Sequence, residues 1–344
     1  MNDDTVLIVN PNSNSGLTGK NWDSIFHTLC DFFGENIEVV FTKKEGDGTA
    51  LARGCLKKGF KNIIPIGGDG MINEVANGFF EEDSEIQEVD LNTDTNFLPH
   101  LALKPINPDS IMTILPSGTR NVLVQSLSLP NDFEECCKIL GSCYTSKKID
   151  VIAALVTDPE NPSRCIRRVF LNAAEIGIGA EIISKAKDMR KKVNSRLLST
   201  IAGIATTIPT YKSNICEITT GIDRDGDKME DKIITKMTMG IIANGRFLGG
   251  GVQAASKAAM NDGLLDIVII KDSDGLAFLK EAISMKNDNP STTEVAENIY
   301  YKQSQNVSLT SKEEKGVIVT TDGEPIGELP AFFKVFHNLL TIRI

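Results

Sequence analysis

A carboxylate stands inside a glycine-rich stretch near residue 68, in the sequence PIGGDGMINEV at positions 65–75. A buried-strand run precedes the glycines and a helical pattern follows them, so they lie at a strand-to-helix turn. Backbone N–H groups at such a turn, together with the helix N-terminus, bind phosphate. Asp69 would repel phosphate unless a cation lies between them. The stretch therefore predicts a phosphate site in which Asp69 holds Mg²⁺ through water.

Two further polar loops follow predicted strands in the same way. One is NPNSNSG at 10–16 and the other is SGTRN at 117–121. Because ligands in an open parallel sheet bind beyond the carboxyl ends of the strands, the three loops are expected to converge on one edge. The sequence NSGLTGKN around Lys20 lacks the first glycine and the final hydroxyl residue of a Walker A loop, and no dinucleotide-binding pattern follows the first strand. The predicted phosphate site is therefore of another type.

A second candidate carboxylate, Glu324, lies in the stretch TTDGEPI. Phosphoryl transfer to an alcohol requires positive charge near the phosphates and a base that accepts the hydroxyl proton. Asp69 and Glu324 are the predicted catalytic residues, and the division of these two roles between them is left open. A hairpin turn is the alternative for Glu324, and a loop-stabilising turn residue is the alternative for Asp69.

Strand and helix patterns alternate over residues 1–147. This alternation predicts a doubly wound parallel sheet with helices on both faces. An acidic excursion at about 81–108 interrupts it as a surface segment, and whether 81–95 forms a lid is left open. The predicted strands lie at 5–10, 37–42, 62–68 and 111–116.

The pattern changes at residue 148. Short strand-like runs separated by turn residues predict a mostly antiparallel β-sandwich over 148–344, and 181–207 is predicted to be helical. The chain is thus expected to comprise an α/β nucleotide domain and a β-rich domain, with a ligand cleft between them.

The composition is that of a soluble globular enzyme of two domains. The chain has 344 residues, of which 41% are hydrophobic and 24% charged. A net charge of −10 argues against nucleic acid as a partner. No secretory leader and no membrane span is recognised, and the seven scattered cysteines are expected to be reduced, so the expected location is the cytoplasm.

Taken together, the motifs resemble one known family. GGDGMINEVANG followed by ILPSGTRN is similar to the catalytic domain of the diacylglycerol and sphingosine kinases. LNAAEIGIGAEI, the run ANGRFLGGGVQAASKAAMNDGLLDIVII and TTDGEPI resemble later motifs of the family in the same order. The resemblance covers nearly the whole chain and implies a soluble bacterial or archaeal lipid kinase-like protein, with an α/β ATP domain and a β-rich lipid domain.

The resemblance also implies roles for individual residues. Asp69 would face the phosphates, and Glu324 would be the base for the acceptor hydroxyl. Asp262, Asp266 and the backbone of Leu265 would hold a structural Mg²⁺, with a turn as the alternative. The residues that would bind ATP are Asn10, Ser13, Thr42, Gly67, Gly68, Gly70, Gly118, Thr119 and Asn121.

Several positions depart from the family pattern. Met71 stands where the family usually has threonine after GGDG, which removes a hydroxyl from the loop. GTRNVLVQ lacks the aspartate and arginine of the form G-T-G-N-D-F-A-R, and QAAS lacks the usual proline. These differences leave the lipid's identity open, and Met71 favours a non-catalytic lipid- or nucleotide-binding protein as an alternative.

A basic stretch runs from Lys185 to Arg196 and contains six basic residues against the single acidic Asp188. Apolar residues follow it at helical spacing, among them Leu198 and Ile201. The pattern predicts a transient contact with an anionic membrane surface. A solvated helix with a buried stripe is the alternative.

The sequence thus predicts an ATP- and Mg²⁺-dependent kinase that transfers the γ-phosphoryl group to a hydroxyl of diacylglycerol or a related lipid. It is expected to be cytoplasmic and peripheral at the membrane. An NAD kinase-like enzyme, whose family shares GGDG, and a kinase for a soluble polyol are the alternatives among enzymes. The oligomeric state is open, and a homodimer is one candidate.

Overall fold

The computed structural model describes residues 4–82, 101–142, 145–190, 196–224, 227–249, 251–272 and 298–344. The expected lid at 81–95 lies outside the described residues except for Glu81 and Glu82. The basic stretch is described as far as Arg190 and again from Arg196.

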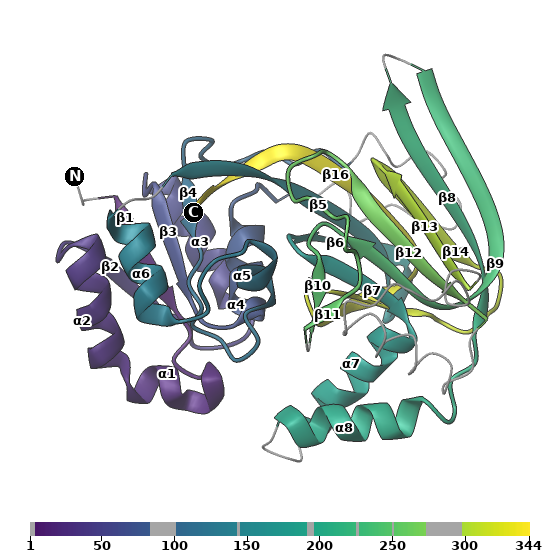
Figure 1. Cartoon of the computed structure of the whole chain (residues 1–344), viewed down its shortest axis with the longest axis horizontal. Coiled ribbons are helices and arrows are strands. Elements are labelled where there is room, and N and C mark those ends of the chain that lie inside the picture. The colour runs from purple at the N-terminus through teal and green to yellow at the C-terminus, as the bar shows by residue number, and fades with distance from the viewer. Residues whose placement is uncertain are drawn as a thin grey trace.

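Four parallel strands form the first part of the sheet, in the order β2-β1-β3-β4 (Figure 1). Each strand is short and apolar, and β1 and β3 are almost completely buried because helices cover both faces. The strands are β1 (Thr5–Val9), β2 (Glu38–Phe41), β3 (Asn62–Ile66) and β4 (Ile111–Thr113).

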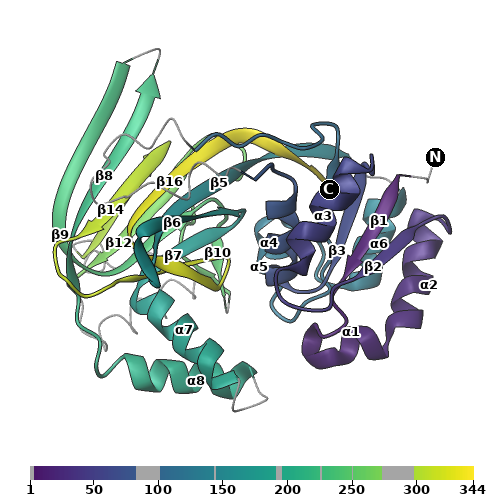
Figure 2. The same cartoon turned by 180° about the vertical axis from the view of Figure 1, so that it is seen from behind.

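Helices cover the parallel sheet in two layers, and Figure 1 and Figure 2 show these layers from opposite sides. The side chains of β1 point alternately toward one layer and the other. Val6 and Ile8 pack with α3 (Asp47–Lys57) and α4 (Asp69–Gly78), whereas Leu7 and Val9 pack with α2 (Trp22–Phe33) and α6 (Phe133–Ser142). This arrangement follows from the two-residue period of a strand. The shorter helices are η1 (Asn14–Gly16), α1 (Leu17–Lys20) and α5 (Val122–Ser126).

The second part is antiparallel and rich in β-strands, so the predicted fold class is confirmed. Its long strands pack a second apolar core that includes Phe170, Ile218 and Phe333. The strands are β5 (Ser146–Asp158), β6 (Asn161–Phe170), β7 (Ala173–Gly177), β8 (Asn214–Arg224), β9 (Asp227–Ala243), β10 (Phe247–Leu248), β11 (Val252–Gln253), β12 (Leu265–Lys271), β13 (Ile299–Ser304), β14 (Asn306–Ser311), β15 (Ile318–Thr321) and β16 (Glu324–Arg343).

The last strand, β16, connects the two parts of the sheet. It pairs with β5 over most of its length, and Thr341–Arg343 pair in parallel with β4 of the first part. The chain therefore ends beside the strand at which the first part ends, as Figure 1 shows. The predicted division between residues 147 and 148 falls at the start of β5, which begins at Ser146, and it stays a prediction.

A helical arm extends from β7 at the position where the sequence predicts helix. It consists of α7 (Ile178–Arg190) and α8 (Arg196–Thr207), which pack against each other below the sandwich (Figure 1). No helix within the described parts of the chain is long and apolar enough to cross a membrane.

Candidate active site

Two of the three glycine loops are fixed against each other at the edge of the parallel sheet. The Ser117 hydroxyl accepts a hydrogen bond from the Gly67 N–H at 2.8 Å, and it donates to the Gly67 carbonyl at 2.9 Å. A Cβ atom on Gly118 would lie 2.5 Å from the Cα of Gly68, so this contact requires glycine at position 118. The predicted phosphate-binding backbones of both loops are thus side by side.

The first-strand loop and the end of β2 reach the same edge. The Asn10 N–H donates to Ile66 O at the end of β3, and the Thr42 hydroxyl donates to Val9 O at the end of β1, at 3.3 Å. The Thr119 hydroxyl donates to Asn14 Oδ1 at 3.5 Å, which joins the third loop to the first.

Two predicted nucleotide residues hold the shape of their own loops. Ser13 shares a 2.6 Å hydrogen bond with the Thr18 hydroxyl. Asn121 has a positive φ of 50° at the start of α5, and its Oδ1 accepts the Gly118 N–H at 2.9 Å. All nine predicted nucleotide residues therefore gather at the carboxyl edge of the sheet, where their role stays a prediction.

Asp69 opens helix α4 and lies between the two glycine loops and a cavity. Its Oδ1 accepts the Leu123 N–H from the start of α5 at 3.3 Å. Burial raises the pKa of Asp69, although the N–H groups of Leu123 and Val122 and the positive charge of Arg120 oppose that rise. A half-buried carboxylate held by a backbone donor beside two glycine loops is suited to a cation that also contacts phosphate.

Glu324 is brought to the same loops from the other end of the chain. A Cβ atom on Gly70 would lie 3.5 Å from Oε1 of Glu324, so the Glu324 side chain lies beside the glycine loop. Glu324 Oε2 pairs with the Lys187 ammonium at 2.8 Å, and Lys187 also pairs with Glu45 at 2.7 Å. Burial lowers the pKa of Lys187, but the hydrogen bonds to Glu324 and Glu45 outweigh burial and raise it.

Asp322, two residues before Glu324, joins the two halves of the molecule. It accepts hydrogen bonds from Asn73 Nδ2 of α4 at 2.9 Å and from the N–H groups of Leu171, Asn172 and Ala173 at 3.0–3.1 Å. Burial raises its pKa and these four donors oppose the rise. Since every one of these contacts uses the carboxylate, Asp322 fixes the turn that carries Glu324.

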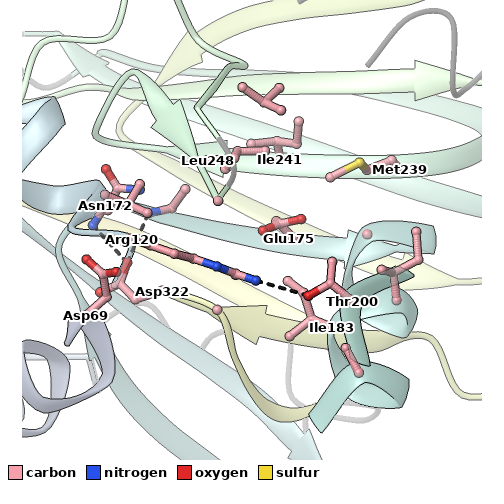
Figure 3. A pocket seen from close by; sticks show the side chains of 18 of the residues that line it. Asp69, Arg120, Asn172, Glu175, Ile183, Thr200, Met239, Ile241, Leu248 and Asp322 are labelled. Atoms are coloured by element: carbon pink, nitrogen blue, oxygen red, sulfur yellow. Dashed lines mark hydrogen bonds between the residues drawn. The ribbon is translucent and has the colours of Figure 1, made fainter. Parts of the chain in front are cut away.

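A cavity of about 290 Å³ opens from these carboxylates into the second half of the molecule (Figure 3). Asp69 and Asp322 lie at one end, and Gly323 also lines it. The walls come from α4, α5, β7, the helical arm and β9–β12. They are mostly apolar and include Ile182, Ile183, Ile204, Met239, Ile241 and Leu248. The volume is at the lower end of the range for small-molecule sites.

The residues predicted to hold a structural Mg²⁺ lie at the start of β12. Asp266 is buried, and its carboxylate accepts hydrogen bonds from the Tyr301 hydroxyl and Gln303. Asp262 is more exposed, and its Oδ1 accepts the Leu264 N–H at 3.0 Å. In the described part of the chain, no three His, Cys, Asp or Glu side chains are grouped closely enough for a metal ion. The donors of Asp266 thus fit a structural network better than a metal cage, and the Mg²⁺ assignment stays a prediction.

The Met71 side chain packs against the inner side of the glycine loop, where a Cβ atom on Gly67 would lie 2.6 Å from the Cβ atom of Met71. Its side chain is 5% exposed and belongs to the core between α3 and α4. A Cβ atom on Gly48 of α3 would lie 3.1 Å from its Cε atom. The residue that departs from the family pattern is therefore a packing residue in this chain.

Residues 4–154 match the family model for the diacylglycerol kinase catalytic domain, and residues 172–344 match the model for the YegS C-terminal NAD kinase beta sandwich-like domain. The chain belongs to the family that carries the YegS C-terminal domain, joined here to a diacylglycerol kinase catalytic domain. As a member of this family, it is a phosphotransferase with an alcohol group as acceptor. The resemblance to diacylglycerol and sphingosine kinases is thereby confirmed.

Members and structural neighbours of the diacylglycerol kinase family cover the chain almost completely. "Probable lipid kinase YegS-like" from Enterobacter sp. is 29% identical over 84% of this chain and 80% of its own length. The crystal structure of a diacylglycerol kinase from Bacillus anthracis has a TM-score of 0.60 at 21% identity, covering 99% of this chain and 96% of its own. Yeast NADH kinase has a TM-score of 0.50 at 10% identity, covering 100% and 83%. Both structures establish likeness of fold.

Four residues of the site were not predicted from the sequence: Arg120, Glu175, Lys187 and Asp322. Arg120 stood within a motif already singled out, and Asp322 within TTDGEPI. Glu175 is a charged residue in an apolar strand run, which is an unusual pattern for a fully covered strand. Nothing in the local sequence distinguishes Lys187 from its basic neighbours.

Proposed function

We propose that the protein is an ATP-dependent lipid kinase that transfers the γ-phosphoryl group to a hydroxyl of diacylglycerol or a related lipid alcohol. The observation that carries the proposal is the meeting of three features at one place. Glu324 lies beside the glycine loop at Gly70, and Asp69 of the same loop lines the end of an apolar cavity. A phosphate donor on the loops and an acyl chain in the cavity would then meet at these two carboxylates.

In this mechanism, separate residues bind the phosphates and accept the proton. The backbone N–H groups of the loops at 67–70 and 117–121 bind and orient the phosphates. Glu324 accepts the proton of the acceptor hydroxyl as the oxygen–phosphorus bond forms. The Asp69 carboxylate provides the negative charge that would hold a cation against the phosphates. Asp69 would hold a Mg²⁺ ion bound with the nucleotide, and that ion would supply the positive charge that neutralises the phosphate oxygens.

The apolar cavity supports a lipid as the acceptor rather than a soluble polyol. A polyol has hydroxyl groups along its whole length, and each one that entered the apolar part would lose hydrogen bonds to water. An acyl chain gains free energy there because its surface leaves water. The cavity also gives a reason to prefer a lipid over NAD, whose polar nicotinamide ribose would face the same walls.

We also propose that the helical arm contacts the membrane that holds the substrate. Leu198 and Ile201 of α8 are exposed apolar side chains, and the basic stretch from Lys185 to Arg196 precedes them in the sequence. Apolar side chains beside basic ones are typical of helices that lie in an anionic interface. The same arm forms one wall of the cavity, so a lipid would have a short path from the membrane to the site.

Product analysis tests the function. The purified chain is incubated with γ-labelled ATP, Mg²⁺ and a panel of lipids in mixed micelles, with NAD and glycerol in parallel reactions. We expect label in an organic-extractable lipid phosphate. Label in NADP or glycerol phosphate, with none in any lipid, would overturn the proposal.

A further inference from the structure

Besides Asp69, Asp322 and Arg190, two further charged side chains line the cavity, and the transfer mechanism uses neither of them. Arg120 comes from the loop at 117–121, and Glu175 comes from β7 (Figure 3). They reach the cavity from the two halves of the molecule. Charged groups are rare in apolar surroundings because their loss of water costs free energy. Two such groups in one cavity therefore indicate a ligand that forms hydrogen bonds with them.

Glu175 points into the cavity because of the alternation of its strand. Ala174 and Ile176 lie in the sandwich core, so Glu175 faces the opposite side, toward the helical arm. A Cβ atom on Gly179 of α7 would lie 2.7 Å from its Oε2 atom. Among the described residues, no donor lies within hydrogen-bond distance of this carboxylate. Burial raises the pKa of Glu175 to about 7, against the nearby charge of Arg120.

Arg120 crosses the cavity between the nucleotide loops and the helical arm. Its Nη2 donates to the Thr200 hydroxyl of α8 at 3.3 Å, and its charge opposes the rise that burial causes in the pKa of both Asp69 and Glu175. In the described structure, no ion pair joins Arg120 to Glu175. The guanidinium and the carboxylate therefore face the same space with hydrogen-bonding capacity to spare on both.

We propose that Arg120 and Glu175 select a lipid that carries a second hydrogen-bond donor, a hydroxyl or an amide N–H, close to the hydroxyl that is phosphorylated. The proposal rests on the lipid kinase function proposed above. Glu175 accepts a hydrogen bond from this donor, and Arg120 donates to a neighbouring ester or amide carbonyl.

The chemistry distinguishes between simple lipids. A 1,2-diacylglycerol has a single hydroxyl, which is the one that reacts, so Glu175 would stay unpaired beside it. A 1-monoacylglycerol has a second hydroxyl, and an N-acyl amino alcohol has an amide N–H. A cationic lipid amine would meet the positive charge of Arg120 as well as the carboxylate, so a neutral donor fits the pair better.

The test compares kcat/KM for 1-monoacylglycerol, an N-acyl amino alcohol and 1,2-diacylglycerol of matched acyl chains. For the natural chain we expect the two donor-bearing lipids to exceed diacylglycerol by about tenfold, the effect of one hydrogen bond to a charged group. Glu175→Leu should bring this ratio close to one by lowering the activity on the donor-bearing lipids. Glu175→Gln, which keeps a carbonyl acceptor, should retain part of the ratio.

Glu181→Gln is the matched control, because Glu181 pairs with Lys185 at 2.9 Å and does not line the cavity. It should keep the ratio of the natural chain. A preference for diacylglycerol in the natural chain, or an unchanged ratio in Glu175→Leu, overturns the inference. If none of the lipids is phosphorylated, the kinase proposal itself fails. In that case the dissociation constants of the same three lipids are measured for the natural chain and for Glu175→Leu. Tighter binding of the donor-bearing lipids that is lost in Glu175→Leu would support the selection by Arg120 and Glu175, and equal binding would overturn it.

Discussion

At the scale of single residues, Asp69 and Glu324 approach the glycine loops with different surroundings. Asp69 is half-buried at the start of α4, and its carboxylate accepts the Leu123 N–H of α5. The side chain of Glu324 is 40% exposed and pairs with the ammonium group of Lys187. A group that must take up and release a proton needs such access, whereas a group that positions charge needs a fixed place. Glu324 is therefore the better candidate for the base.

Asp69→Asn should lower kcat/KM by at least about 100-fold, because the amide keeps the shape but loses the charge that faces the phosphates. Its melting temperature should not fall, since the amide avoids the cost of burying a charge. Steady-state kinetics and thermal unfolding check both expectations. Asp158→Asn, at a turn where Oδ1 accepts the Glu160 N–H, serves as control. Full activity of Asp69→Asn would show that the proposed mechanism is wrong.

Glu175 should make the stability of the protein depend on pH. Its folded pKa of about 7 lies above the ordinary value of 4.5, so the folded state binds more protons between these pH values than the unfolded state. Stability therefore falls as pH rises through this window. Glu175→Gln removes the effect, and its gain in unfolding free energy over the natural chain should be larger at pH 8.5 than at pH 5.5, by on the order of 2 kcal/mol. Chemical denaturation at both pH values measures it, and an equal difference would contradict the assignment.

At the scale of elements, helix α7 connects the helical arm to the nucleotide side. Lys187 bridges Glu45, just before α3, and Glu324 at the start of β16. Its neighbour Lys185 pairs with Glu181 one turn away on the same helix. The two lysines thus differ in what they join, although they lie on the same helix.

Lys187→Ala should lower kcat/KM by about five- to tenfold, because Glu324 loses the contact that orients it toward the glycine loop. Stability should change by less than about 1 kcal/mol, since the ion pairs are partly exposed. Kinetics and thermal unfolding of Lys187→Ala and Lys185→Ala give the comparison. Equal kinetic effects from both variants would mean that the bridge has no role in orientation.

Helix α8 should carry the membrane contact. Replacing both Leu198 and Ile201 by serine should lower binding to anionic liposomes at least about tenfold, as apolar side chains lose the interface. Flotation measures it. The matched control replaces Met229 and Ile234 of the β8–β9 hairpin by serine; these are 65% and 61% exposed, against 57% and 53% for the α8 pair. Unchanged binding after charge reversal at Arg190, Lys191 and Lys192 would separately rule out an electrostatic contribution.

At the scale of the whole molecule, two features join the halves. The strand β16 belongs to the sandwich along most of its length and adds its last residues to the parallel sheet. Asp322 receives hydrogen bonds from α4 on one side and from the β6–β7 connection on the other. The halves are thus expected to unfold together rather than as separate domains.

Asp322→Ala should destabilise the protein by about 3 kcal/mol, because it leaves four buried donors without their acceptor. The melting temperature should fall by roughly 5 °C. Calorimetry of the natural chain should show one transition. Two separate transitions, or an Asp322→Ala variant as stable as Asp158→Ala, would show that the carboxylate does not couple the halves.

The sequence by itself determined the local part of the site. Hydrophobic periodicity and turn residues predicted the four parallel strands, the helices between them and the glycine loops at their carboxyl ends. These patterns are readable because each depends on a few neighbouring residues. The convergence of the loops then follows from the geometry of any parallel sheet.

The tertiary structure decided which distant residues meet. Asn73 and Asp322 are hydrogen-bonded across 249 positions, and Glu324 lies beside Gly70 across a similar separation. Periodicity tells that Glu175 lies on the face opposite Ala174, but not that this face lines a cavity crossed by Arg120. A local sequence pattern predicts which face of a helix or strand is buried. The element that packs against this face is determined by the packing of the whole chain.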